Sequence, residues 1–271
     1  MDRYAVFGNP ISHSLSPRIH ARFGELTGDR IEYTAIAAPV GAFAETAREF
    51  FAAGGRGVNV TLPFKIDAFE MAAHRSERAA LAGAANFLHA REDGIHADNT
   101  DGAGLVADLD RNLRVRLEGA QLLLLGAGGA ARGVIAPLLA ARPHLLVIAN
   151  RTEITAIELA TRFSYLGPIA GASLDRIPRG SYQVVINATS TSTHGNALHL
   201  PKHVFRAGGV AYDMAYGAPA VPFLEYARSL GALKTSDGLG MLVEQAAESF
   251  FLWRGRRPPT APVLAELRAA R

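Results

Sequence analysis

The chain has 271 residues, of which 49% are hydrophobic and 20% are charged, and it contains no cysteine. This length predicts about two domains, each large enough to bury a hydrophobic core without covalent cross-links. The absence of cysteine excludes disulfides, thiolate metal sites, iron–sulfur clusters and a cysteine nucleophile.

The charge pattern argues against nucleic acid as a partner. The formal net charge is only +3, and the densest groups of cations lie at 111–116 and 254–257. Neither group is interleaved with aromatic residues or belongs to a nucleic-acid-binding motif, so we interpret both as solvated helix faces. Lysine is rare among these cations, with only Lys65, Lys202 and Lys234 in the chain.

The apolar segments are too short for a signal peptide or a membrane span. The start of the chain, MDRYAVFGNPIS, has an acidic Asp2 and only a brief apolar run. The longest apolar stretch, AQLLLLGAGGAA, is shorter than the roughly 20 residues of a transmembrane helix. We therefore expect a soluble, cytoplasmic protein with no membrane partner.

Short apolar strands alternate with helices from the N-terminus, which predicts an α/β fold with mostly parallel sheets. Ser16 and Pro17 fit the N-cap and the first position of the first helix, and Gly28 fits its end. In this first block the predicted strands are 4–7, 32–37, 58–60, 85–89 and 94–97, and the predicted helices are 17–26, 40–53, 64–73 and 77–82.

A second block begins near Asp101 with a helix through residue 113 and continues with a βαβ pattern. A last apolar helix is predicted over 241–253. Between them, the predicted strands are 121–125, 145–149, 184–187, 210–213 and 232–235, and the predicted helices are 129–141, 153–163 and 222–230.

A glycine-rich segment, GAGGAA at 126–131, follows the first strand of this block and opens a helix. It matches the G-x-G-x-x-A pattern of dinucleotide-binding folds, in which the helix N-terminus binds a pyrophosphate. A glycine-rich turn that binds nothing is the alternative, and the position within a βαβ unit disfavours it. The predicted cofactor-binding residues here are Gly126, Ala127, Gly128, Gly129 and Ala130.

The residues after the next strand favour NADP over NAD. Enzymes that use NAD place an acidic residue there to bind the ribose 2′-hydroxyl, whereas this chain has Asn150, Arg151 and Thr152. An arginine with flanking amide and hydroxyl donors suits a 2′-phosphate, and a solvated loop cation is the alternative.

Three polar segments of the first block are candidates for a substrate site. Ser14 and Ser16 are hydroxyl donors near a helix N-terminus that could hold a carboxylate, although Ser16 could also serve only as an N-cap. Lys65 lies in the first turn of a predicted helix, where a cation is disfavoured and becomes a better proton donor. A surface lysine is the alternative, and a neighbouring Asp101 would oppose the effect of the helix end. Asp101 could cap a helix, or it could orient Lys65 and accept from a substrate hydroxyl.

Together these motifs resemble the shikimate dehydrogenase family over nearly the whole chain. The matching segments, in order, are GNPISHSLSP, NVTLPFK, GAANFL, NTDGAG, LLGAGGAARGV, NRT, INATS, YDMAYG and DGLGMLVEQAA. The resemblance implies an N-terminal α/β substrate domain at 1–101, completed by a C-terminal helix within 237–271, and an NADP-binding Rossmann domain at 102–236. It also implies reversible reduction of 3-dehydroshikimate to shikimate, in aromatic amino-acid biosynthesis.

The resemblance also implies roles for individual residues. Lys65 and Asp101 would be the catalytic pair. Ser14 and Ser16 would bind the substrate carboxylate. Hydroxyl contacts would come from Asn59, Thr61, Asn86, Asp101 and Gln245, with Tyr216 nearby, and the nicotinamide end of NADP would lie near Thr189, Met214 and Gly238.

The chain departs from the family pattern at three places. Thr155 stands where a second arginine often binds the 2′-phosphate, which implies a weaker NADP preference. Phe87 replaces a common threonine beside Asn86, and INATSTSTHG has extra hydroxyl residues in its loop.

Other functions stay open at this point. The main alternative is a quinate or dual-specificity dehydrogenase, followed by a noncatalytic NADP-binding regulator. The nine histidines lack H-E-x-x-H or comparable spacing, so no metal is expected. The expected partner is a small-molecule substrate, and the chain is expected to be a monomer or a homodimer.

Overall fold

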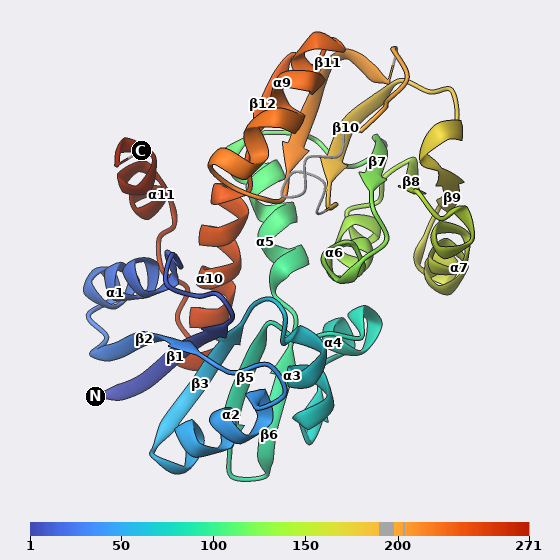
Figure 1. Cartoon of the computed structure of the whole chain (residues 1–271). Helices are drawn as coiled ribbons and strands as arrows, with labels where there is room; N and C mark the ends of the chain where they lie inside the picture. The colour runs from blue at the N-terminus through green and yellow to red at the C-terminus, as the bar shows by residue number, and fades with distance from the viewer. Residues whose placement is uncertain (190–197, 203, 271) are drawn as a thin grey trace. The chain divides into compact units, whose positions relative to one another are not determined.

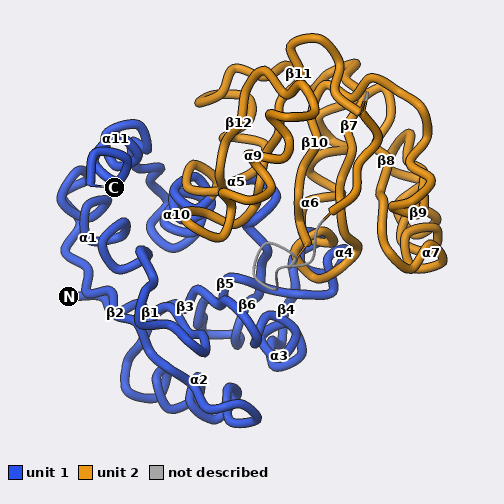
Figure 2. Tube along the Cα trace, turned by 45° about the horizontal axis from the view of Figure 1, so that its top comes forward, with its two compact units in different colours: residues 1–104, 242–271 blue, residues 105–241 orange. Residues whose placement is uncertain are grey.

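The computed structural model describes residues 1–189, 198–202 and 204–270. The chain forms two compact units, the first with residues 1–104 and 242–271 and the second with residues 105–241 (Figure 2). The expected boundaries after residues 101 and 236 differ from these by three and five residues (104 against 101, 241 against 236). No helix within the described ranges is long and apolar enough to span a membrane.

The sheet of the first unit is mixed, with strand order β2-β1-β3-β5-β6-β4 (Figure 1, with β4 labelled in Figure 2). Strands β1, β2 and β3 are parallel, β5 runs antiparallel to β3 and to β6, and β4 pairs in parallel with β6. The strands are β1 (Asp2–Gly8), β2 (Ile31–Ala37), β3 (Gly55–Val60), β4 (His74–Arg75), β5 (Phe87–Arg91) and β6 (Gly94–Asp98).

The helices of this unit bury apolar faces against the sheet. Phe43 and Phe50 of α2 pack on Phe7 of β1, and Trp253 of α10 packs on Tyr4. The helices are α1 (Ser16–Thr27), α2 (Phe43–Ala52), α3 (Lys65–Met71), α4 (Glu77–Ala82) and α11 (Ala261–Ala269), with α5 (Asp101–Ala107) and α10 (Leu239–Arg254) each continuing across a unit boundary.

The sheet of the second unit is fully parallel, with strand order β12-β11-β10-β7-β8-β9. Counted from β7, this is the 3-2-1-4-5-6 order of a Rossmann fold, which reverses direction between β7 and β10. The continuous apolar run of β7 suits a strand covered on both faces, since residues 122–125 are fully buried. The strands are β7 (Gln121–Leu125), β8 (Leu145–Asn150), β9 (Ile169–Ser173), β10 (Tyr182–Asn187), β11 (Phe205–Asp213) and β12 (Lys234–Ser236), with helices α6 (Gly129–Ala140), α7 (Glu153–Phe163) and α9 (Val221–Ser229).

Several predicted element boundaries are wrong. Ser16 is the first residue of α1 rather than its N-cap, and its N–H is bonded by the Ser14 hydroxyl at 3.3 Å. The helix predicted through residue 113 ends as an α-helix at Ala107 and continues as a π-helix over Asp108–Asn112. Here the buried Asp108 accepts hydrogen bonds from Tyr212 and Asn112, so its position is set by tertiary contacts.

Candidate active site

The centre of the candidate site is an ion pair between two helix N-termini of the first unit. Lys65 is the first residue of α3, and its Nζ lies 2.5 Å from Oδ2 of Asp101, the first residue of α5. The side chains are 23% and 11% exposed, respectively. The carboxylate thus orients the ammonium group, and the remaining exposure leaves it open to a small ligand.

Asn86 fixes the other oxygen of this carboxylate. Its Nδ2 donates to Asp101 Oδ1 at 2.8 Å, and the same group lies within hydrogen-bond distance of Thr100 Oγ1 and Gln245 Oε1. The Asn86 Oδ1 accepts from the Thr100 backbone N–H at 2.7 Å. The amide side chain is therefore locked in one orientation, and the predicted residues Asn86, Asp101 and Gln245 do lie together.

Asn59 belongs to the same buried network. Its Nδ2 donates to Ser249 Oγ at 2.9 Å and to the backbone carbonyl of Asn86 at 3.2 Å, and its Oδ1 accepts from the Tyr33 hydroxyl at 2.8 Å. Ser249 in turn contacts Thr100 Oγ1 at 3.2 Å. The amide of Asn59 is thus linked through one hydroxyl to Thr100, which contacts Asn86.

Tyr33 connects this network to the first polar segment. Burial raises the pKa of its hydroxyl well above the ordinary value, and a hydrogen bond with Ser16 opposes that shift. Tyr33 also stacks on the ring of His20 at 4.1 Å between centroids. Burial lowers the pKa of His20 to about 3, so this imidazole is neutral at physiological pH.

Sequence reasoning missed Tyr33, Thr100 and Ser249. Tyr33 and Ser249 read locally as ordinary strand and helix residues, and Thr100 reads as one more polar residue in the segment before Asp101. The decisive partners can be remote, since Asn59 and Ser249 are separated by 190 positions. The one available signal was a serine within the apolar helix predicted over 241–253, where a buried hydroxyl needs a partner.

Thr61 lies just after β3 and its methyl group faces Gly8. A Cβ at Gly8 would come within 2.5 Å of Thr61 Cγ2, so glycine is required for this close approach. Ser14 lies in the segment between β1, which ends at Gly8, and α1, and Ser16 is the first residue of α1. The contacts of these three residues with a substrate stay predictions.

The glycine-rich segment of the second unit lies at the carboxyl end of β7, where the strand order reverses. Gly126 has a φ of 102°, and a Cβ there would meet Thr189 and the carbonyl of Ala188. Among the described residues, a Cβ at Gly128 or Gly129 would meet nothing within 4 Å, and no side chain caps α6. The backbone N–H groups at a helix start beside such space fit the pyrophosphate of a dinucleotide.

The residues predicted to contact the rest of the cofactor also follow strand ends of this unit. After β8, the side chains of Arg151 and Thr152 are exposed, and Asn150 Nδ2 donates to the carbonyl of Thr152 at 3.0 Å. After β10, Thr189 Oγ1 donates to Asn187 Oδ1 at 2.6 Å.

Met214 and Gly238 follow the ends of β11 and β12. A Cβ at Gly238 would lie 2.2 Å from the carbonyl oxygen of Met214, so only glycine permits this approach of the two backbones. Tyr216, predicted near the substrate, is half-buried in the second unit, and its role stays a prediction. The extra hydroxyl residues at 190–193 lie outside the described residues.

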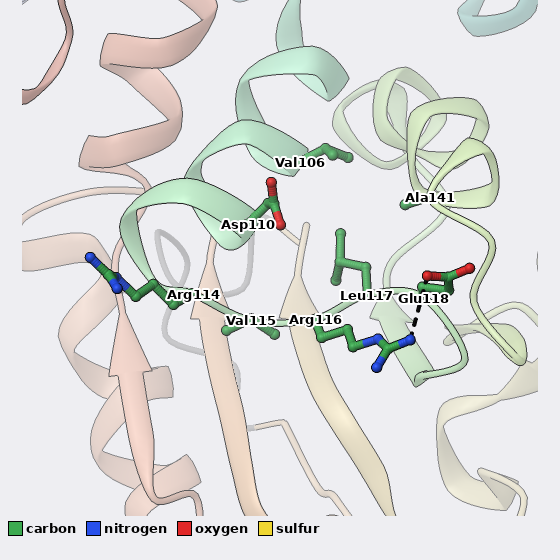
Figure 3. A pocket seen from close by; sticks show the side chains of 8 residues that line it. All are labelled: Val106, Asp110, Arg114, Val115, Arg116, Leu117, Glu118 and Ala141. Carbon is green, nitrogen blue, oxygen red and sulfur yellow. Dashed lines mark ion pairs between the residues drawn. The ribbon is translucent and has the colours of Figure 1, made fainter.

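One pocket of about 480 Å³ in the second unit is not the predicted site (Figure 3). Its lining residues come from the segment that precedes β7 and from the end of α6. The pocket therefore lies at the amino ends of the strands, whereas the glycine-rich segment lies at their carboxyl ends. Its basic and acidic side chains compensate one another, since Arg116 pairs with Glu118 at 3.5 Å. It is lined by Val106, Asp110, Arg114, Val115, Arg116, Leu117, Glu118 and Ala141.

Comparison with known proteins decides the family. Residues 6–88 match the shikimate dehydrogenase substrate binding domain, 108–199 match shikimate / quinate 5-dehydrogenase, and 238–268 match the shikimate 5′-dehydrogenase C-terminal domain. The chain is 53% identical over 268 residues to shikimate dehydrogenase (NADP(+)) of Dechloromonas aromatica, covering 99% of this chain and 98% of that protein. The chain belongs to the shikimate dehydrogenase family.

Solved structures agree with membership of the shikimate dehydrogenase family. An Ael1 enzyme from Pseudomonas putida is 44% identical with a TM-score of 0.91, and 98% of each chain is covered. Shikimate 5-dehydrogenase from Thermus thermophilus, crystallised with NADP(H) and shikimate, is 32% identical with a TM-score of 0.84 over the whole of both chains. The predicted two-domain α/β fold with a Rossmann unit is confirmed.

Proposed function

We propose that this chain catalyses the reversible, NADP-dependent reduction of 3-dehydroshikimate to shikimate. The observation that carries the proposal is the Lys65–Asp101 pair, 2.5 Å apart, in a chain whose relatives of similar length are NADP-dependent shikimate dehydrogenases. An amine and a carboxylate in contact are suited to transfer a proton to or from a ring oxygen.

The proton step assigns opposite roles to the two members of the pair. In the direction of reduction, the ketone carbon accepts a hydride, and the Lys65 ammonium gives one proton to the developing alkoxide. In the direction of oxidation, the neutral amine takes the hydroxyl proton while the ring carbon gives up a hydride. Asp101 holds the amine in place through one oxygen, while Asn86 fixes the other oxygen.

The remaining polar residues of the first unit would orient the substrate. Ser14 and Ser16 supply hydroxyl donors suited to a carboxylate, which is the only ionised group of shikimate. Ring hydroxyls would be bound by Asn59, Thr61, Asn86, Asp101 and Gln245. Because most of these side chains are already held by one another, little ordering is needed when the substrate binds.

The second unit would hold NADP. When bound, the nicotinamide supplies or accepts the hydride. Backbone donors of Ala127, Gly128, Gly129 and Ala130 would bind the pyrophosphate, while Gly126, whose own N–H is bonded to the Ala149 carbonyl, would form the turn that lets it approach. Asn150, Arg151 and Thr152 would bind the adenosine ribose with its 2′-phosphate. Thr189, Met214 and Gly238 would lie near the nicotinamide, and Tyr216 near the substrate.

Quinate is a second candidate substrate. The family model matched by residues 108–199 covers shikimate and quinate 5-dehydrogenases alike. Quinate differs from shikimate by an additional ring hydroxyl and a saturated ring, so acceptance depends on space around the site rather than on a different chemistry. We propose shikimate as the main substrate, since the names of the related proteins specify it.

The test is a comparison of kcat/KM for shikimate and quinate, each with NADP and with NAD. We expect the highest value for shikimate with NADP. A higher value for quinate would reassign the substrate. Absence of any oxidation, with NADP binding retained, would instead support a noncatalytic NADP-binding regulator.

A further inference from the structure

Three metal-ligating side chains meet at the edge of the first unit's sheet, outside the candidate active site. His74 in β4 and His96 in β6 are direct partners in the parallel ladder, so their side chains lie on the same face. Their rings stack at 4.4 Å between centroids. Asp93, in the turn between β5 and β6, accepts from His96 Nε2 at 2.7 Å and lies 3.5 Å from His74 Nε2.

The three groups converge closely enough to share one ion. One ligand atom from each residue lies within 4.8 Å of the other two. A tetrahedral zinc ion, with bonds of roughly 2.0–2.1 Å, places its ligand atoms about 3.3 Å apart. The 3.5 Å separation between His74 Nε2 and Asp93 Oδ2 already fits, and the 2.7 Å hydrogen bond from His96 Nε2 to the other oxygen, Oδ1, would open by a small rotation of the side chains.

The chemistry of the donors selects the class of ion. Two imidazole nitrogens and one carboxylate are typical of zinc and other divalent transition metals, whereas calcium and magnesium prefer oxygen ligands. The exposed fractions of the side chains, 24% to 62%, leave room for a water in a fourth position.

We propose that His74, Asp93 and His96 bind one zinc ion, or a divalent transition metal with similar ligand preferences. Local spacing in the sequence did not indicate this site because His74 comes from a different strand. A bound ion would connect the two-residue strand β4 to β6 and to the β5–β6 turn. This connection would stabilise the edge of the sheet between α3, which begins with Lys65, and α4.

The test is calorimetric titration of the full chain, without an affinity tag, with zinc chloride. The absence of cysteine removes competing thiolate ligands. We expect one equivalent of zinc to bind, with affinity reduced at least tenfold in His74→Asn, Asp93→Asn and His96→Asn. The matched control is His144→Asn, an exposed histidine of the second unit, which should bind zinc as the wild type does.

Thermal unfolding gives a second readout. Zinc should raise the melting temperature of the wild type and of His144→Asn, but not of His74→Asn. Without zinc, all of these proteins should melt at similar temperatures, because the replaced side chains are partly exposed. The proposal is overturned if no zinc binds at micromolar concentration, or if His74→Asn and His144→Asn bind it equally.

A second, independent observation concerns the cofactor preference and rests on the proposed function. The end of β9 lies beside the end of β8, since Ser173 pairs with Asn150 in the parallel ladder. The short helix that follows, Leu174–Arg176, places Arg176 Nη2 at 2.9 Å from Glu153 Oε2, at the start of α7. A second guanidinium therefore stands near the strand end that carries Arg151.

We infer that Arg176 acts with Arg151 in binding the 2′-phosphate of NADP. A phosphate monoester carries nearly two negative charges at neutral pH, which suits two cations better than one. The Arg176 side chain is 76% exposed, and its hydrogen bond among the described residues goes to Glu153, so it is available to exchange that carboxylate for a phosphate. Thr155, in the first turn of α7, offers a hydroxyl in the same region.

Calorimetric binding of 2′,5′-ADP and of 5′-AMP separates this inference from the proposed function. Arg176→Ala should weaken 2′,5′-ADP binding about tenfold and leave 5′-AMP binding unchanged. Glu153→Gln, which frees Arg176, should strengthen 2′,5′-ADP binding. The matched control, Arg179→Ala, should bind both nucleotides as the wild type does. If the wild type binds 2′,5′-ADP and Arg176→Ala does so equally well, only this inference fails. If the wild type does not bind 2′,5′-ADP, NADP dependence fails as well.

Discussion

The Lys65–Asp101 pair should couple activity to stability. Replacing one member leaves the other charge largely buried without its counter-ion, since the side chains are 23% and 11% exposed. Removing one partner of a fully buried pair costs about 3–5 kcal/mol. Because this pair keeps some solvent contact, we expect the free energy of unfolding to fall by about 2–3 kcal/mol in Lys65→Met and in Asp101→Asn.

The double variant Lys65→Met/Asp101→Asn carries neither charge, so its loss of stability should be smaller than the sum of the single losses by about 1–2 kcal/mol. Asparagine at position 101 also keeps an oxygen acceptor for Asn86 Nδ2. Activity should behave differently. Lys65→Met should lower kcat by about 10²–10⁴-fold, and the double variant should be no worse, because the two residues act as one unit.

Urea denaturation and initial rates of NADPH formation from shikimate measure the two effects on the same samples. The physical reasoning is refuted if the single losses of stability add in the double variant, since the charges would then be independent. The catalytic role of Lys65 is refuted if Lys65→Met keeps kcat within tenfold of the wild type.

Two further predictions concern the buried surroundings of the pair. Ser249→Ala removes the acceptor for Asn59 Nδ2, so it should raise KM for shikimate several-fold with a smaller change in kcat. It should also lower the free energy of unfolding by about 1–3 kcal/mol. The control Ser229→Ala, on α9, should change neither KM nor stability. For His20, with a native pKa of about 3, only the unfolded imidazole binds a proton between pH 6.5 and 3. Its contribution to the free energy of unfolding therefore falls by up to about 1.4 kcal/mol per pH unit on acidification through this range. In His20→Phe, the urea concentration at the midpoint of unfolding should depend less steeply on pH. An unchanged slope would contradict the assignment.

The sequence predicts secondary structure best where consecutive residues of a segment are all buried. The run of leucines in β7, followed by glycines, predicts the strand, the turn and α6 because a parallel strand covered on both faces needs apolar residues at every position. Strands β4 and β9 were missed. The first has only two residues, His74 and Arg75, and the second reads IAGAS, without a distinct apolar pattern.

Helix α11 was also missed, although Pro262 near its start is a recognised helix-initiating signal. Its buried Val263, Leu264 and Leu267 define a short apolar face, and three such positions over nine residues did not stand out within the C-terminal segment. Periodicity is weakest for a helix of this length.

For the site, sequence motifs identified residues whose types already suit the chemistry, but not those that hold them. Lys65 and Asp101 were predicted because a rare lysine and a boundary carboxylate stand near helix starts, whereas Asn86 was predicted only because the segment GAANFL resembles the family pattern. Tyr33 and Ser249 act on Asn59 through contacts between segments far apart in the chain. Only the folded structure shows which hydroxyl meets which amide.

The C-terminal helix α10 contributes both to the fold of the first unit and to the arrangement of the candidate site. Gln245 and Ser249 are four residues apart, so they lie on the same face of α10, one turn from each other. One contacts Asn86 and the other Asn59, the two buried amides next to the proposed substrate position. An unsatisfied buried donor costs about 1–3 kcal/mol, so displacement of α10 would penalise both amides at once. The helix that completes the fold of the first unit therefore also sets the orientation of its hydrogen-bonding groups, and proper folding of that unit is a condition for substrate recognition.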